Sequence, residues 1–130
     1  MDVDMKQMLD ALMDADNAVR RSAEHFFTER LNTDGVGMVQ TLLSIFSDTS
    51  CITIHRSFAG VLLRRAVEKC QFSAEKNVEL RSLLTHLWKN ETDITLLKRL
   101  AHIMAQSAMN SSWVELLPQV LDSVRMNMCV

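Results

Sequence analysis

A chain of 130 residues with 48% apolar residues and a formal net charge of −2 has the length of one domain and enough apolar side chains to form a core. A net charge of −2 lacks the basic excess that is typical of nucleic-acid binders and so argues against that class of protein. No apolar stretch approaches the roughly 18 residues that a membrane span needs. One proline, three glycines and no tyrosine favour helices over strands.

Cysteine usage and the first residues indicate an intracellular protein. The three cysteines, Cys51, Cys70 and Cys129, are odd in number and far apart, so they predict neither a disulfide framework nor a zinc site. The start, MDVDMKQMLD, has two acids among its first four residues and no apolar run, which excludes a secretory signal and argues against a mitochondrial presequence. We therefore expect a soluble protein of the cytosol or nucleus.

Apolar residues recur at three- and four-residue spacing, which predicts about seven helices. The first three cover about residues 4–13, 17–31 and 36–46, with polar cap clusters at 14–16 and 32–35 between them. Their apolar faces consist, in chain order, of Met5, Met8, Leu9 and Leu12; of Val19, Ala23, Phe26, Phe27 and Leu31; and of Val39, Leu42, Leu43 and Phe46.

The remaining four helices are expected at about 51–70, 73–88, 94–109 and 113–124. Gly60 lies inside the fourth, where a glycine costs about 1 kcal/mol relative to alanine. It is either simply tolerated or marks the close approach of a neighbouring helix or a partner. Pro118 lies inside the last apolar pattern and should kink that helix.

The predicted helices form consecutive pairs whose first members start near residues 4, 36, 74 and 113, a spacing typical of two-helix HEAT or armadillo-type repeats. We therefore predict an all-α, right-handed solenoid of antiparallel helix pairs. Repeat 1 covers about 4–32, repeat 2 about 35–70 and repeat 3 about 73–110. The first helix of repeat 4 covers about 113–125 and has no partner, so the chain is expected to be the N-terminal part of a longer solenoid.

No catalytic constellation is recognised. His25, His55, His86 and His102 fall in four different predicted helices, and none shows metal-ligand spacing with another histidine, a cysteine or a carboxylate. The sequence has no glycine-rich phosphate loop and no Gly-x-Ser-x-Gly motif. We expect neither an enzyme nor a cofactor or metal.

Polar residues gather on one face of the second helix in each pair, opposite its apolar residues. In a stacked solenoid equivalent helices lie side by side, so these faces would form one protein-binding surface. The alternative is that each is simply a solvated face. The three sets are Arg20, Arg21, Glu24, His25 and Thr28; Ser57, Gly60, Arg64 and Glu68; and Thr95, Lys98, Arg99, His102 and Gln106, the last opposite Leu97, Leu100, Ala101, Met104 and Ala108.

Three stretches together resemble the N-terminal end of importin-β (karyopherin-β) nuclear transport receptors. Residues 12–26, LMDADNAVRRSAEHF, are similar to the family's acidic turn followed by an Ala-Glu-x-x-Phe helix. Residues 58–65, FAGVLLRR, look like its Ala-x-x-x-Leu-Lys/Arg helix. Residues 113–118, WVELLP, resemble its Trp-Pro-Glu-Leu-x-Pro opening of the fourth repeat, with Val114 in place of the usual proline.

This resemblance implies the Ran-GTP-binding region of an import receptor that shuttles between cytoplasm and nucleus. Ran-GTP binding would change the curvature of the solenoid and release cargo, while cargo and nucleoporins would bind mainly beyond Val130. The resemblance places a Ran-facing basic residue at Arg64. The other inner-helix residues expected to face Ran are Arg20, Arg21, Glu24, Ser57, Gly60, Lys98, Arg99, His102 and Gln106.

Two other functions are compatible with the pattern. A general HEAT scaffold or adaptor without a GTPase partner has the same periodicity. A helix-turn-helix nucleic-acid binder would use Arg64 and Arg65, but the net charge of −2 disfavours it. The unpaired last helix, with Val114, Leu117, Val120 and Leu121, would also expose an apolar face through which the chain could self-associate.

Overall fold

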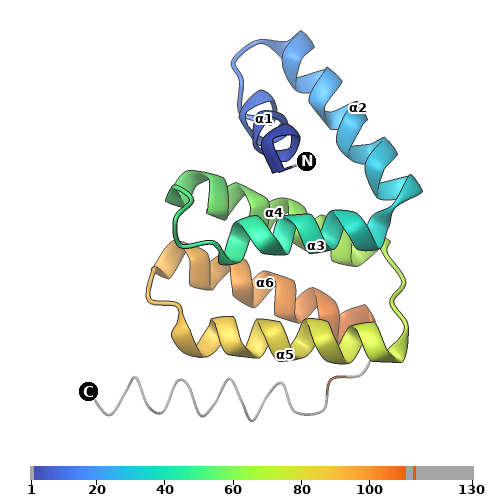
Figure 1. The fold of residues 1–130 in the computed structure, drawn as a ribbon, viewed down its shortest axis with the longest axis vertical. Coiled ribbons are helices and arrows are strands. Elements are labelled where there is room, and N and C mark those ends of the chain that lie inside the picture. Colours follow the sequence, from blue (N-terminus) through green and yellow to red (C-terminus); the bar gives the residue numbers. More distant parts are fainter. Residues whose placement is uncertain (1, 111–112, 114–130) are drawn as a thin grey trace. The chain divides into compact units, whose positions relative to one another are not determined.

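The computed structural model describes residues 2–110 and Trp113, with side chains from Met5 onward (Figure 1). Within this part of the chain it is all-helical, with six helices and no strand, as the sequence predicts. The chain divides between Gln71 and Phe72 into two compact units, which are described separately. Apart from Trp113, the expected seventh helix, its Pro118 and its apolar face lie outside the described residues.

The first unit contains α1 (Asp2–Leu12), α2 (Asn17–Thr33), α3 (Gly35–Ser47) and α4 (Thr53–Lys69), and the second contains α5 (Ala74–Asn90) and α6 (Ile94–Asn110). Each helix begins and ends within two residues of its predicted bounds. None of these six helices is both long enough and apolar enough to cross a membrane.

Polar side chains fix where α2 and α3 begin in the first unit. The Asp16 carboxylate accepts a hydrogen bond from the Ala18 backbone N–H across 2.8 Å at the start of α2, and Asp34 accepts one from Gly37 across 3.1 Å at the start of α3. These bonds satisfy N–H groups that have no partner inside the helix. The clusters at 14–16 and 32–35 therefore act as caps, as expected, whereas the N-cap of α4 is Ile52, which forms no side-chain capping bond.

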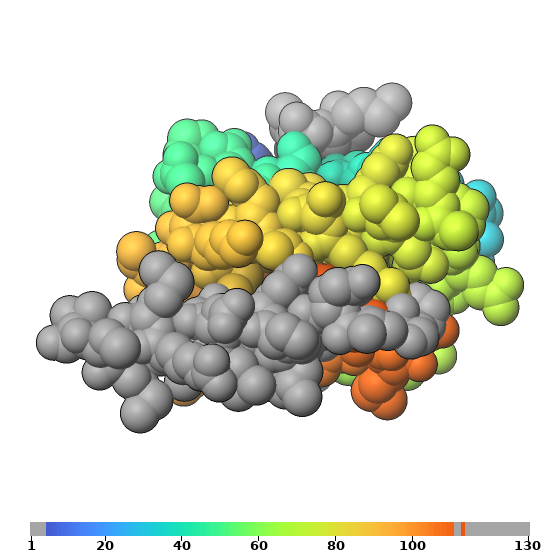
Figure 2. Space-filling model, turned by 90° about the horizontal axis from the view of Figure 1, so that it is seen from below, coloured from blue at the N-terminus to red at the C-terminus, as the bar shows by residue number. Residues whose placement is uncertain are grey.

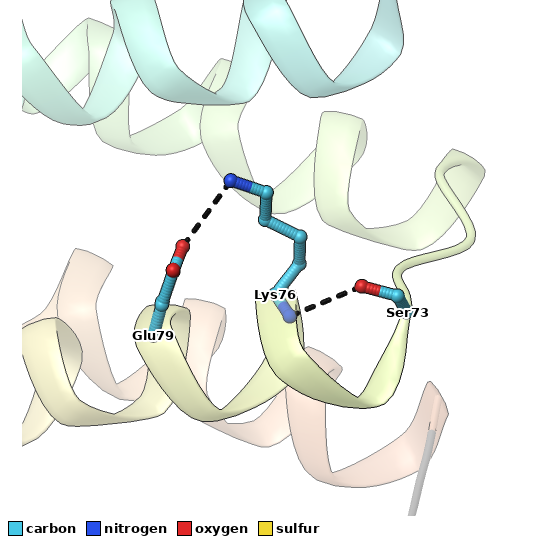
Figure 3. A network of polar contacts seen from close by, with 3 residues as sticks. All are labelled: Ser73, Lys76 and Glu79. Carbon is cyan, nitrogen blue, oxygen red and sulfur yellow. Dashed lines mark hydrogen bonds and ion pairs between the residues drawn. The ribbon is translucent and has the colours of Figure 1, made fainter.

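The second unit uses the same device at both helix starts. The Ser73 hydroxyl oxygen accepts a hydrogen bond from the Lys76 backbone N–H across 3.2 Å, and the Lys76 ammonium lies 3.3 Å from Glu79, one turn further along α5 (Figure 3). Asp93 accepts a bond from the Leu96 N–H across 3.1 Å and so begins α6.

The helices of the first unit contact one another as the pairs α1–α2 and α3–α4, and α3 and α4 lie side by side (Figure 1). Between the pairs, α2 contacts α3 and α1 contacts α4. The predicted apolar faces of the first and third helices are confirmed, except that Leu12 is only half-buried. The buried apolar residues of this unit are Met5, Met8, Leu9, Ala23, Phe27, Met38, Val39, Leu42, Leu43, Ile45, Phe46, Ala59, Leu62, Leu63, Ala66 and Val67.

Two longer-range side-chain contacts add to this core. His55 Nε2 on α4 lies 2.6 Å from the Asp10 carboxylate on α1. The Arg65 guanidinium on α4 lies 5.4 Å from the centre of the Phe27 ring on α2, a cation–π contact. The second helices of the first two pairs therefore touch each other directly.

In the second unit, α5 contacts α6 over a smaller core. Trp113 is buried there beneath the Arg81 guanidinium, 5.1 Å from its ring. Figure 2 shows the surface of α5 in yellow-green to yellow. Val78 and Leu83 are exposed apolar residues of this helix. The buried apolar residues of this unit are Leu80, Leu84, Leu96, Leu100, Ile103, Met104 and Trp113.

Candidate protein-binding surface

On α2 the predicted surface residues divide into two kinds. Arg21 and Glu24 are exposed, as a partner-facing role requires. Arg20 instead turns back on its own chain, where its guanidinium donates to the Asp14 backbone oxygen across 2.9 Å and to the Asn17 side-chain oxygen. Arg20 therefore holds the turn between α1 and α2.

The rest of the α2 polar face is also exposed. His25 and Thr28 face solvent, and His25 Nε2 lies 3.1 Å from the Glu29 carboxylate one turn further on. Because both partners are exposed, this contact adds little to stability. The accessible polar set on α2 is Arg21, Glu24, His25 and Thr28.

On α4 the predicted set is only partly accessible. Gly60 is buried and Ser57 is half-buried, so Gly60 cannot contact a partner at this surface. Arg64 is half-exposed, and its guanidinium lies 3.7 Å from the Glu68 carboxylate one turn away. Arg64 and Glu68 are therefore the accessible charged residues of the predicted set on this helix.

On α6 the exposed residues of the predicted set are Thr95, Lys98 and His102. Arg99 is half-buried. Gln106 is buried, and its amide donates to the Asn110 side-chain oxygen across 3.0 Å. Gln106 therefore bonds to the last residue of α6 and is not part of the exposed surface.

Gln106 is buried because the buried face of α6 is rotated about the helix axis relative to the predicted face. Leu100 and Met104 are buried as predicted, but Ala101 is exposed. Leu96, Ile103 and Ser107 are buried in its place. The rotation carries Gln106 into the interior and leaves Lys98 and His102 outside.

A groove that the sequence analysis did not identify lies between α1 and α2. Val19 and Phe26, expected in the core beside Ala23 and Phe27, are 37% and 38% exposed. They line this open groove, whose volume is about 610 Å³. Its lining consists of Gln7, Met8, Ala11, Ala18, Val19, Ser22, Ala23 and Phe26. The sequence offers one sign of this groove: the apolar face of α2 is wider than a single neighbouring helix can cover.

No protein-family model matches this chain, and neither a curated protein nor a solved structure shows significant similarity to it. The resemblance to importin-β receptors therefore rests on the residues of the chain itself.

Two side chains have perturbed acid–base properties. Hydrogen bonds from the Ser50 hydroxyl and backbone N–H, and from the Cys51 thiol, hold the pKa of Asp48 below its usual value. Burial raises the pKa of the Cys70 thiol. Among residues 2–110 and Trp113, no group of three or more histidines, cysteines and carboxylates is arranged to hold a metal ion.

Proposed function

We propose that this chain is the N-terminal Ran-GTP-binding region of an importin-β type nuclear import receptor, which acts by binding other proteins and without catalysis. Such a receptor shuttles between cytoplasm and nucleus. Import cargo and nucleoporins would bind mainly to repeats that follow Val130.

The observation that carries the proposal is that the second helix of each contacting pair presents accessible charged and polar side chains. These are Arg21 and Glu24 on α2, Arg64 on α4, and Lys98 and His102 on α6. Charged and polar side chains on rigid helices suit the recognition of a protein surface, because their positions are fixed by the packing beneath them.

A right-handed solenoid is part of this proposal. The contacts between the first two pairs, α1 with α4, α2 with α3 and Arg65 with Phe27, are the kind that successive repeats need in order to bury a continuous core. We infer that the third pair and a fourth repeat, starting near Trp113, extend the same stacking.

Arg64 is the residue to which we assign the leading role. Its guanidinium is half-exposed and is oriented by Glu68 at 3.7 Å, one helical turn away. Arginine presents several donors in a fixed plane and pairs well with carboxylates and backbone oxygens of a partner. A charge reversal there should therefore weaken binding more than one at an unrelated exposed lysine.

The test measures binding of the full chain to Ran loaded either with a non-hydrolysable GTP analogue or with GDP. We expect clear preference for the GTP form and a loss of about tenfold for Arg64→Glu, since a charge reversal at a contact costs more than 1 kcal/mol. Lys89→Glu, which reverses an exposed charge on α5 outside the proposed surface, is the matched control.

Equal affinity for the two nucleotide forms, or equal effects of the two substitutions, would contradict the proposal. Absence of binding to either form would favour the second candidate, a HEAT-repeat scaffold or adaptor without a GTPase partner. That candidate predicts the same helix pairs and the same exposed charges, but no dependence on the nucleotide.

A further inference from the structure

The groove between α1 and α2 is lined by both small and bulky side chains. The small side chains are Ala11 on α1, and Ala18, Ser22 and Ala23 on α2. Met8, Val19 and Phe26 stand beside them. Small residues facing each other between two helices allow a third helix to approach closely, as in tightly packed helical bundles.

Apolar surface remains open to water along this groove. The exposed fractions of Val19 and Phe26, 37% and 38%, are large for side chains beside a core, and no residue of α3 or α4 lines the groove. Covering apolar surface contributes about 25 cal/mol per Å². An apolar occupant would therefore be favoured.

The groove is long enough for a helix. Beyond Phe26 a second hollow of about 370 Å³ continues along α2, lined by Phe26, Glu29, Arg30, Asn32 and Thr33. From Ala18 to Thr33 α2 spans about 22 Å, which equals about four helical turns or 15 residues. This length matches grooves that bind an amphipathic helix through apolar side chains at three- and four-residue spacing.

The two ends of the groove differ in charge. At the turn between the helices, the exposed carboxylates of Asp14 and Asp16 accept bonds only from the backbone N–H groups of Asp16 and Ala18. In the described part of the chain, neither carboxylate forms an ion pair, because the nearby Arg20 bonds backbone oxygens and Asn17 instead. The two carboxylates outweigh the one guanidinium of Arg20, so this end has a net negative charge.

The other end of the groove carries one acidic and one basic side chain, whose charges offset each other. The Arg30 guanidinium lies 5.8 Å from the Phe26 ring centre, and both Arg30 and Glu29 line the second hollow. An occupant with positive charge at one end only would be attracted to the turn end and would be oriented by that attraction.

We propose that this groove binds an amphipathic helix of a partner protein, with a bulky apolar stripe over Val19 and Phe26 and basic residues over Asp14 and Asp16. The proposal is independent of Ran binding, because Arg21 and Glu24 lie on a different side of α2. It gives the first helix pair a second interaction surface.

The probe is a synthetic amphipathic helix of about 15 residues with a leucine stripe and two lysines at one end. A second peptide has glutamates in place of the lysines, and a third has the stripe shuffled. Fluorescence anisotropy with the full chain at low salt should show the lysine peptide binding about fivefold or more tighter than the glutamate peptide. The shuffled peptide should not bind.

Two sets of variants locate the binding. Asp14→Asn with Asp16→Asn keeps both hydrogen-bond acceptors, since asparagine caps helices as well as aspartate does, and removes the charge. It should abolish the preference for lysine. Val19→Asp should reduce binding about tenfold or more, while Val78→Asp, at an exposed valine of α5, should leave it unchanged.

Equal affinity for the lysine and glutamate peptides, or equal binding by Val19→Asp and Val78→Asp, would overturn the proposal. Sedimentation of the full chain supplies the other decisive result. A dimer that Val19→Asp dissociates would show that the groove is an interface between copies of this chain, and would also overturn the proposal. A failure of Ran binding would leave these results unaffected.

Discussion

Arg56 Nε donates a hydrogen bond to the Phe46 backbone oxygen across 2.9 Å, and the Arg56 side chain is buried. Phe46 lies in the last turn of α3, where backbone oxygens have no partner inside the helix. The positive charge of Arg56 also faces the negative end of the helix dipole. The Arg56 side chain, from the start of α4, therefore supplies a hydrogen-bond donor that the end of α3 lacks.

Replacing this arginine should destabilise the first unit. Arg56→Met keeps much of the apolar stem but leaves a buried oxygen without its donor, which should cost about 2–3 kcal/mol. Urea unfolding of the full chain, followed by circular dichroism, measures the loss. Arg21→Met, at an exposed position of α2, should cost less than about 0.5 kcal/mol. Equal losses would show that the Arg56 contact contributes nothing specific.

The start of α3 lies against the end of α4 at Gly35 and Cys70. A methyl group at Gly35 would overlap the Cys70 Sγ atom, so Gly35→Ala should force the thiol to move and cost about 1 kcal/mol. Cys70→Ala removes the obstructing atom. In a double-mutant cycle the two substitutions together should cost less than the sum of their separate effects. Strict additivity in thermal unfolding would contradict this packing.

The connection between α3 and α4 should respond to acid through Asp48. Its folded-state pKa lies below the usual 3.8, because Ser50 and Cys51 donate hydrogen bonds to the carboxylate. A lowered pKa stabilises the folded state above the usual value, and the contribution disappears as the pH falls through the folded-state value. Asp48→Ala should therefore be less stable than the unaltered protein near neutral pH.

This stability difference should shrink as the pH falls below about 3.8. Thermal unfolding of both proteins from about pH 7 to pH 3 measures it. A difference that stays constant over the whole range would show that the Asp48 carboxylate charge does not stabilise this connection.

Local rules predicted the helix ends well. Asp16, Asp34 and Ser73 cap helices because their short side chains reach backbone N–H groups a few residues away, a property that depends on neighbouring sequence alone. The three- and four-residue spacing likewise predicted six helices to within two residues at each end.

Side-chain environments were predicted less well, because they depend on tertiary contacts. The sequence placed Gln106 on a solvated face, but the rotation of α6 buries it. It placed Phe26 in the core, but Phe26 is 38% exposed and lines the groove, to which α3 and α4 contribute no residue. Arg56 was not singled out, since nothing local distinguishes a buried arginine from an exposed one.

Arg20 and Arg21 provide the sharpest separation of structural from partner-binding roles, because they are adjacent in sequence and carry the same charge. The Arg20 guanidinium donates to the Asp14 backbone oxygen across 2.9 Å, whereas Arg21 is exposed. Arg20→Gln should lower stability by about 1 kcal/mol, which corresponds to a few degrees in Tm. Arg21→Gln should leave Tm unchanged.

Binding should show the opposite order. If α2 faces Ran as proposed, Arg21→Gln should weaken binding to the GTP form about fivefold. Arg20→Gln should weaken it much less at a temperature where the variant remains folded, since its guanidinium is already engaged in the turn between α1 and α2. Calorimetry and surface plasmon resonance on the same preparations measure both quantities. Stronger impairment by Arg20→Gln would mean that this turn, and not the exposed face of α2, contacts the partner.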